Sequence, residues 1–155
     1  METKKYLQQV KNLDKEIRFR ENEINALQAR AKEIADMRGR KTRVDTECVD
    51  RRLDAVCETL DENIAEHRAA VCRLNETIIE ISREIVKLKD LDEVMCLTLR
   101  YIQLMSWDDI ASATVFSKRH LRRIHDRGIE HLDSLLNSDR LPVKPDRETD
   151  GGGAN

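Results

Sequence analysis

Residues 99–136 read LRYIQLMSWDDIASATVFSKRHLRRIHDRGIEHLDSLL and contain two signals for the start of a helix. Ser106 is followed three residues later by Asp109, which is the spacing of a capping box with Asp in place of Glu. Ser117 offers a second N-cap further along the segment. The segment therefore predicts two helices joined by a turn at residues 114–116.

Apolar residues predict which faces of these helices are buried. The inward positions are Trp107, Ile110 and Ala111 in the first helix and Leu121, Ile124, Ile129, Leu132 and Leu136 in the second. Successive residues turn by about 100° around a helix, so a different set of side chains points to the outer face. That set consists of Lys118, Arg119, Arg122 and Arg123. An earlier helix, capped within residues 90–92, is expected to end before Ser106.

The outer face of the second helix is strongly basic. Residues 117–127 contain those four cations and Arg127, against one carboxylate, Asp126. Arg side chains bind guanine edges in the major groove, and Lys side chains hold phosphates. Two capped helices, a three-residue turn and the small Ala111 at their crossing therefore predict a helix-turn-helix that binds double-stranded DNA. The alternative interpretation is that the basic face is simply solvated, as runs of charge usually are.

The residues that precede this segment carry a coiled-coil pattern, with apolar residues at spacings of three and four. They are Tyr6, Val10, Leu13, Ile17, Ile24, Leu27, Ala31 and Ile34, and then Leu53, Cys57, Leu60, Ile64, Val71, Leu74, Ile78, Ile81, Ile85 and Leu88. Near residues 38–48 the pattern is lost, and we expect a turn there. The sequence predicts a long helical arm, either an antiparallel hairpin or a coiled coil with a second chain, and we expect a homo-oligomer through this coiled coil.

Two polar residues interrupt the apolar pattern, Arg20 in the first stretch and His67 in the second. If the chain folds back at the middle of the break, Arg20 lies opposite a position between residues 64 and 70. A hairpin therefore places Arg20 and His67 in the same or adjacent layers. Polar residues in such a seam commonly fix its register at a cost in stability. This coincidence favours the hairpin. The alternative is that each long side chain merely reaches solvent.

Composition supports an all-α fold. Of 155 residues, 37% are charged and 3% aromatic, with five Gly and two Pro, which is typical of long solvated helices. We expect three parts: a helical arm at residues 1–90, a helix-turn-helix domain at residues 91–137 and a disordered tail at residues 138–155. The break in the arm carries a basic cluster that we interpret as a solvated loop rather than a contact to DNA or a partner. The cluster consists of Arg38, Arg40, Lys41 and Arg43.

Several functional classes have no signal in the sequence. The four cysteines lie far apart with no CxxC motif, so we expect reduced thiols and no metal site; they are Cys48, Cys57, Cys72 and Cys96. A Gly-rich phosphate loop and a nucleophile motif are absent, so we expect neither enzymatic activity nor a cofactor. The net charge of -2 does not argue against DNA, because phosphate affinity depends on local potential. With no apolar targeting or membrane segment, we expect a cytoplasmic protein without a membrane partner.

The C-terminal segment resembles region 4 of bacterial sigma factors, which takes part in promoter recognition. The chain is also similar to a family of small phage and prophage proteins of Gram-positive bacteria. The matching residues are Lys5, Tyr6, Leu7, Asn12, Leu13, Asp14 and Lys15 near the start and Arg100, Tyr101, Ile102, Trp107, Ile110, Ala111, Ser117, Arg119 and His120 near the end. The resemblance covers about residues 4–136. It implies a phage-encoded transcriptional regulator in the bacterial host cytoplasm, with an arm that joins subunits or touches host RNA polymerase. It also implies base and phosphate contacts at Ser117, Lys118, Arg119, Arg122 and Arg123.

One position departs from the family pattern. The turn carries Val115 where the family usually has Gly, and a positive φ there would strain a β-branched residue by roughly 1 to 3 kcal/mol. Two hypotheses follow from the sequence. The first is a DNA-binding transcription regulator. The second is a coiled-coil interaction protein, an inhibitor or adaptor of a host protein, whose C-terminal helices serve only to pack.

Overall fold

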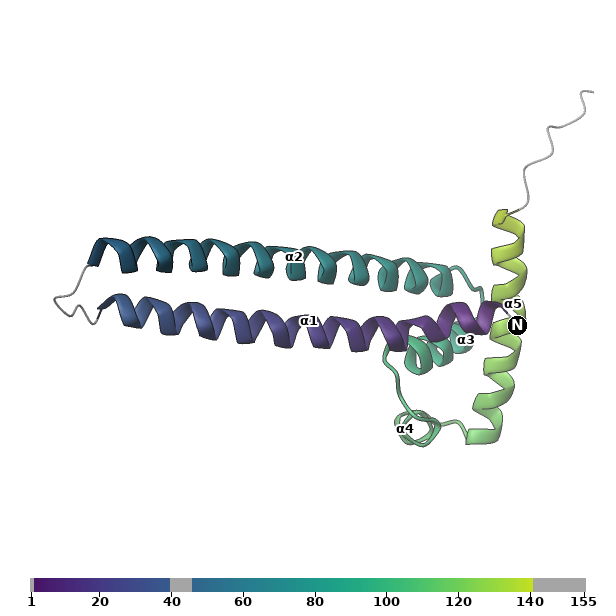
Figure 1. Cartoon of the computed structure of the whole chain (residues 1–155). Coiled ribbons are helices and arrows are strands. Elements are labelled where there is room, and N and C mark those ends of the chain that lie inside the picture. Colours follow the sequence, from purple (N-terminus) through teal and green to yellow (C-terminus); the bar gives the residue numbers. More distant parts are fainter. Residues whose placement is uncertain (1, 40–45, 141–155) are drawn as a thin grey trace, which may run out of the picture.

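The described part of the chain consists of helices joined by short loops and contains no strand, which confirms the predicted all-α class. The computed structural model describes residues 2–39 and 46–140, and the side chains of residues 2–37 and 50–139. Its elements are α1 (Glu2–Gly39), α2 (Thr46–Val86), α3 (Leu91–Leu97), the π-helical segment η1 (Thr98–Ile102), α4 (Trp107–Ala113) and α5 (Lys118–Arg140). Figure 1 shows α1 and α2 as a long pair, with the shorter helices gathered at one end.

The arm is an antiparallel hairpin. Helices α1 and α2 run side by side along their length and form the most extensive contact between any two elements (Figure 1). Helix α1 ends at Gly39 and α2 begins at Thr46, both within the predicted break. Of the two predicted arrangements, the hairpin is therefore the one that forms. The side chains of the basic cluster from Arg38 to Arg43 lie outside the described residues.

Arg20 and His67 meet across the hairpin, as the symmetry of the break predicts. Arg20 Nη1 lies 3.2 Å from His67 Nδ1, and Arg20 Nη2 lies 3.4 Å from Glu16 Oε1. The remaining guanidinium nitrogen, Nε, is buried without a hydrogen-bond partner. The seam therefore contains one polar layer that is only partly satisfied.

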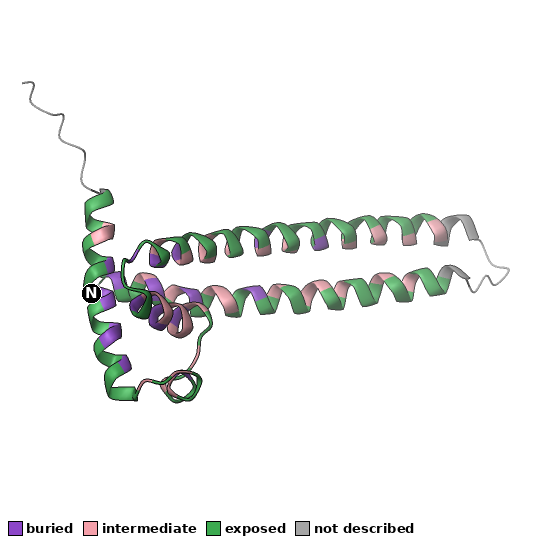
Figure 2. Cartoon of the chain, turned by 180° about the vertical axis from the view of Figure 1, so that it is seen from behind, coloured by how far each residue is buried: buried purple, intermediate pink, exposed green. Residues whose placement is uncertain are grey.

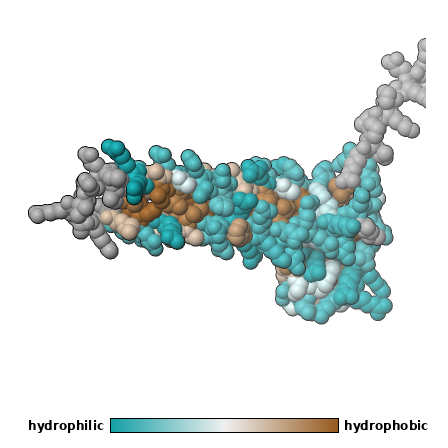
Figure 3. Space-filling model, in the orientation of Figure 1, coloured by the Kyte–Doolittle hydropathy of each residue, from teal (hydrophilic) through white to brown (hydrophobic). Residues whose placement is uncertain are grey.

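Burial in the hairpin decreases with distance from the short helices. The predicted seam residues that are fully or nearly fully buried are Val10, Ile17, Ile64, Ile81, Ile85 and Leu88. At the start of α1 the buried apolar residue is Leu7, whereas the predicted Tyr6 is half-buried. Seam residues nearer the turn are half-buried, among them Leu27, Ile34, Leu53 and Leu60. Figure 2 shows buried positions concentrated at the end where the short helices lie, and Figure 3 shows apolar surface along the α1 and α2 pair toward the turn. Two helices alone do not cover this seam.

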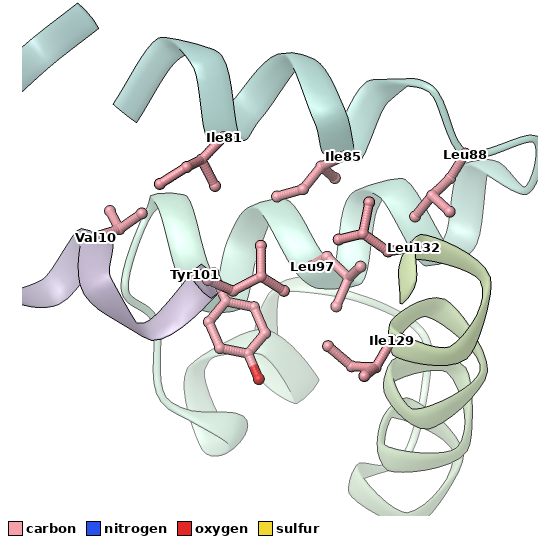
Figure 4. Close-up of a cluster of buried hydrophobic side chains, with 9 residues drawn as sticks. Val10, Ile81, Ile85, Leu88, Leu97, Tyr101, Ile129 and Leu132 are labelled. Carbon is pink, nitrogen blue, oxygen red and sulfur yellow. The ribbon is translucent and has the colours of Figure 1, made fainter. Parts of the chain in front are cut away.

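One apolar core joins the hairpin to the short helices. Its buried members are Leu7, Val10, Ile81, Ile85, Leu88, Leu97, Tyr101, Ile129 and Leu132. Figure 4 shows the labelled members converging from α1, α2, the segment after α2, α3, η1 and α5. The predicted division at residue 90 therefore does not separate two cores. Helix α5 continues to Arg140, three residues past the predicted domain end at 137. The remainder of the predicted tail, residues 141–155, lies outside the described residues.

The backbone between α3 and α4 departs from the regular helix that the sequence predicts. Asp90 caps α3 as expected, accepting a hydrogen bond of 2.9 Å from Asp92 N. The helix then widens into η1, where Gln103 N donates to Thr98 O at 3.0 Å. Among the described residues only Leu104 is a non-glycine residue with positive φ, at 57°. Val115 has no positive φ and is 96% exposed, so the strain considered for the turn does not arise there.

Candidate nucleic-acid interface

Both helices of the predicted motif begin at the serines that the sequence indicates. Asp109 N donates to Ser106 Oγ at 3.1 Å, and His120 N donates to Ser117 Oγ at 3.2 Å. Each serine satisfies a backbone N–H that the first turn of a helix leaves without a partner. These caps fix the start of α4 at Trp107 and the start of α5 at Lys118.

A second apolar cluster sets how α4 and α5 cross. Cys96, Ile110, Leu121 and Ile124 are fully buried, and Leu99, Met105, Trp107, Ala111 and Phe116 pack against them. Burial raises the pKa of the Cys96 thiol to about 11, so this cysteine is a neutral packing residue at pH 7. Trp107, Ile110 and Ala111 therefore face inward as predicted, although Trp107 and Ala111 are only half-buried.

Close packing of α3 on α5 depends on Gly128. A Cβ atom at this position would lie 3.2 Å from Leu97 Cδ1 and 3.4 Å from Glu93 Cβ. The carboxylate of Glu93 is buried in the same contact, and its two oxygens lie 2.9 and 2.8 Å from His131 Nδ1. The short helices are thus held by side-chain polar contacts as well as by apolar packing.

The predicted site residues lie where the helical geometry places them. Ser117, Lys118, Arg119, Arg122 and Arg123 are all exposed, at the N-terminal end of α5 and on the side away from its buried residues. Lys118 Nζ pairs with Asp108 Oδ1 at the start of α4. No hydrogen bond or ion pair links Arg119, Arg122 or Arg123 to another described residue. Three guanidinium groups are therefore available to a ligand.

A buried histidine links α5 to η1. Tyr101 Oη lies 2.7 Å from His125 Nε2, and His125 Nδ1 lies 2.9 Å from Asp126 Oδ1. Burial lowers the pKa of His125, opposed by the nearby Asp126 carboxylate, and burial raises the pKa of Tyr101. Neutral His125 therefore donates from Nδ1 to Asp126 and accepts at Nε2 from the Tyr101 hydroxyl. The Trp107 ring completes this cluster, edge-on to the imidazole at a centroid distance of 5.2 Å.

Arg100 supports the loop between η1 and α4. Its guanidinium carbon lies 4.9 Å from the centroid of the Trp107 ring, and its Nη1 donates to Met105 O at 2.9 Å. Neither Arg100 nor His125 is among the DNA-contacting residues that the sequence predicts. The spacing of the apolar residues does indicate that position 125 is buried, because it lies four residues after Leu121 and seven before Leu132, on the buried face of α5.

No known protein family, curated protein or solved structure gives a significant match to this chain. Within residues 2–39 and 46–140, no helix is both long and apolar enough to span a membrane. Function therefore has to be inferred from the chemistry of the described residues.

Proposed function

We propose that this protein is a sequence-specific DNA-binding transcription regulator in which α4 and α5 form a helix-turn-helix. Helix α5 is the recognition helix, and its N-terminal half enters the major groove. Arg119, Arg122 and Arg123 contact base edges and phosphates, and Lys118 and Ser117 lie at the helix start, where phosphates are commonly held. A phage or prophage origin and a contact with host RNA polymerase belong to this proposal through the resemblance to sigma region 4.

The observation that carries the proposal is the contrast between the two sides of α5. Leu121, Ile124 and Leu132 are fully buried, so the rotation of the helix about its axis is fixed. On the outer side, three exposed guanidinium groups form no hydrogen bond or ion pair with another described residue. An Arg that forms no internal ion pair keeps all of its donors for guanine or phosphate oxygens.

The hairpin contributes to the proposed function as a contact between two copies of the protein. One recognition helix rarely provides enough specificity by itself, and helix-turn-helix proteins commonly place two such helices on two half-sites. The half-buried seam near the hairpin turn offers apolar surface through which a second copy would pack. We therefore include a homo-oligomer in the proposal, with the hairpin as its contact.

The test begins with duplexes that the wild-type protein selects from a random pool, followed by gel-shift titration at several salt concentrations. Arg122→Ala combined with Arg123→Ala removes two outer guanidinium groups. If each makes a base contact worth about 1 to 3 kcal/mol, the double variant binds the selected duplex at least 30-fold more weakly. Arg51→Ala combined with Arg52→Ala is the matched control, because it removes two adjacent exposed arginines from α2.

The control variant is expected to bind like the wild type. Equal loss of binding in both double variants would indicate a general effect of charge and contradict the proposed face. If the wild-type protein selects no duplex but retains a stoichiometric protein partner from host lysate, the competing hypothesis of a coiled-coil inhibitor or adaptor replaces DNA binding.

A further inference from the structure

A cavity of about 530 Å³ lies between the first three turns of α1 and the segment that leads into α4. The lining residues that matter here are Lys4, Gln8, Lys11, Arg100, Trp107 and His125. They come from three separate parts of the chain: α1, the region from η1 to α4, and α5. The cavity therefore exists only because the start of the hairpin folds onto the helix-turn-helix.

The residues that line the cavity carry a net positive charge. Lys4, Lys11 and Arg100 contribute three positive charges, and none of the described lining residues is acidic. Lys4 and Lys11 are exposed, and no ion pair links either of them to another described residue. Gln8 lies on the same face of α1, since positions 4, 8 and 11 follow the helical repeat. In a chain whose net charge is only -2, this is a local concentration of positive charge, with the Asp126 carboxylate paired to His125 in the wall.

Two further observations concern the position of this charge: Lys4 and Arg100 act on buried His125, and the Arg100 guanidinium is held by its neighbours. The charges of Lys4 and Arg100 both act on His125, lowering its pKa in addition to the larger effect of burial. Stacking on Trp107 and donation to Met105 O restrain the Arg100 guanidinium. A guanidinium that is already held loses less conformational freedom when it binds an oxyanion.

The cavity adjoins the basic face of α5. His125, in the cavity wall, lies three residues after Arg122, which is about one helical turn. Trp107, also in the wall, precedes Asp108, whose carboxylate pairs with Lys118. Arg122 is thus about one helical turn from the cavity wall, and Lys118 pairs with one of the two carboxylates, Asp108 and Asp109, in the first turn of α4.

We propose that the cavity lined by Lys4, Lys11 and Arg100 binds backbone phosphates of the same DNA duplex that α5 contacts. This inference rests on the proposed function and extends it, because it makes the first turns of the hairpin part of the DNA-binding surface. Lys4 and Lys11 act as point charges on phosphate oxygens, and Arg100 donates from the nitrogens of its restrained guanidinium. These contacts carry no sequence information.

The test compares Lys4→Gln combined with Lys11→Gln against the wild type on the selected duplex and on an unrelated duplex. Each phosphate contact contributes about 0.9 to the slope of log affinity against log salt. The variant is therefore expected to bind both duplexes more weakly, with a slope reduced by about 1.8. Its affinity deficit shrinks about tenfold between 50 and 200 mM salt, and its preference for the selected duplex is unchanged. Lys5→Gln combined with Lys32→Gln, two exposed lysines of α1 outside the cavity, is the matched control.

A slope equal to that of the wild type overturns the inference, and it leaves the proposed function standing if the Arg122 and Arg123 variant still loses binding. A free phosphate ion presents the same oxygens as the DNA backbone. Calorimetric titration with inorganic phosphate at constant ionic strength tests whether the cavity binds this free ion. One outcome is that the wild type binds phosphate saturably, the Lys4 and Lys11 variant does not, and the salt slope of DNA binding is the same for both. That outcome assigns the cavity to a free anion and overturns its assignment to the duplex. Loss of sequence preference in the variant also overturns it.

Discussion

Replacing the polar layer of the hairpin with apolar residues is expected to stabilise the protein. In the variant Arg20→Leu with His67→Leu, the buried Arg20 Nε, which has no partner, is removed. Leaving such a group unsatisfied costs about 1 to 3 kcal/mol. Two leucines at half-buried seam positions contribute about 1 kcal/mol each, roughly half the value for a fully buried side chain. The lost Arg20 to His67 hydrogen bond offsets about 1 kcal/mol of this gain.

The balance is a gain of about 3 kcal/mol, within the range observed when buried polar pairs are replaced by apolar residues. Urea denaturation followed by the circular dichroism of the helices measures it, and the thermal midpoint is expected to rise by about 10 °C. His67→Leu alone provides the control, since it leaves Arg20 Nη1 without its partner across the hairpin and is expected to destabilise the protein. A double variant no more stable than the wild type would refute the reasoning, because it would mean that the polar layer is not a cost to the hairpin.

Three further predictions concern the C-terminal helices. Because the folded-state pKa of His125 lies below its ordinary value of 6.5, its contribution to stability is complete above that pH and decreases as the pH falls below it. His125→Phe should therefore lose less stability than the wild type between pH 7.5 and 5.5, and an identical loss measured by urea denaturation would contradict this. Leu132→Ala, in the shared core, should cost about 2 to 5 kcal/mol and lower the urea midpoint of α2 and α5 together. Ser117→Ala should cost about 1 kcal/mol and increase amide hydrogen exchange in the first turn of α5, whereas unchanged exchange would mean that the cap is not needed.

Local signals in the sequence predicted the helices and their starts. Ser106, Ser117 and Asp90 each act over two or three residues, so the sequence alone contains the information for these caps. The positions of Arg20 and His67 favoured the hairpin over a coiled coil with a second chain without deciding between them, because two polar interruptions at equal distance from a break face each other if the helices fold back. The exposed face of α5 followed in the same way from the spacing of its leucines and isoleucines.

Contacts between distant segments were not predictable in this way. Val10 fits the predicted coiled-coil seam, and nothing in that pattern indicates that it also lies in one buried cluster with residues of α3, η1 and α5. The cationic cavity could not be predicted for the same reason, since Lys4 and Arg100 lie far apart in the sequence and converge only in the folded chain. The π-helical turn at η1 also escaped prediction, because a single widened turn leaves no change in the apolar spacing that distinguishes it from an ordinary helix.

The shared core has a consequence for how the arm acts in the proposed function. Side chains of both hairpin helices, such as Val10 and Ile85, pack in the same cluster as Leu97 and Leu132 of the short helices (Figure 4). A close-packed core resists continuous deformation, so the direction of the hairpin and the direction of α5 are set together. A partner held along the hairpin, whether a second copy or polymerase, would then fix where the basic face of α5 meets DNA. In a symmetric pair, the spacing of the two half-sites would follow from the packing of the hairpins rather than from a flexible linker.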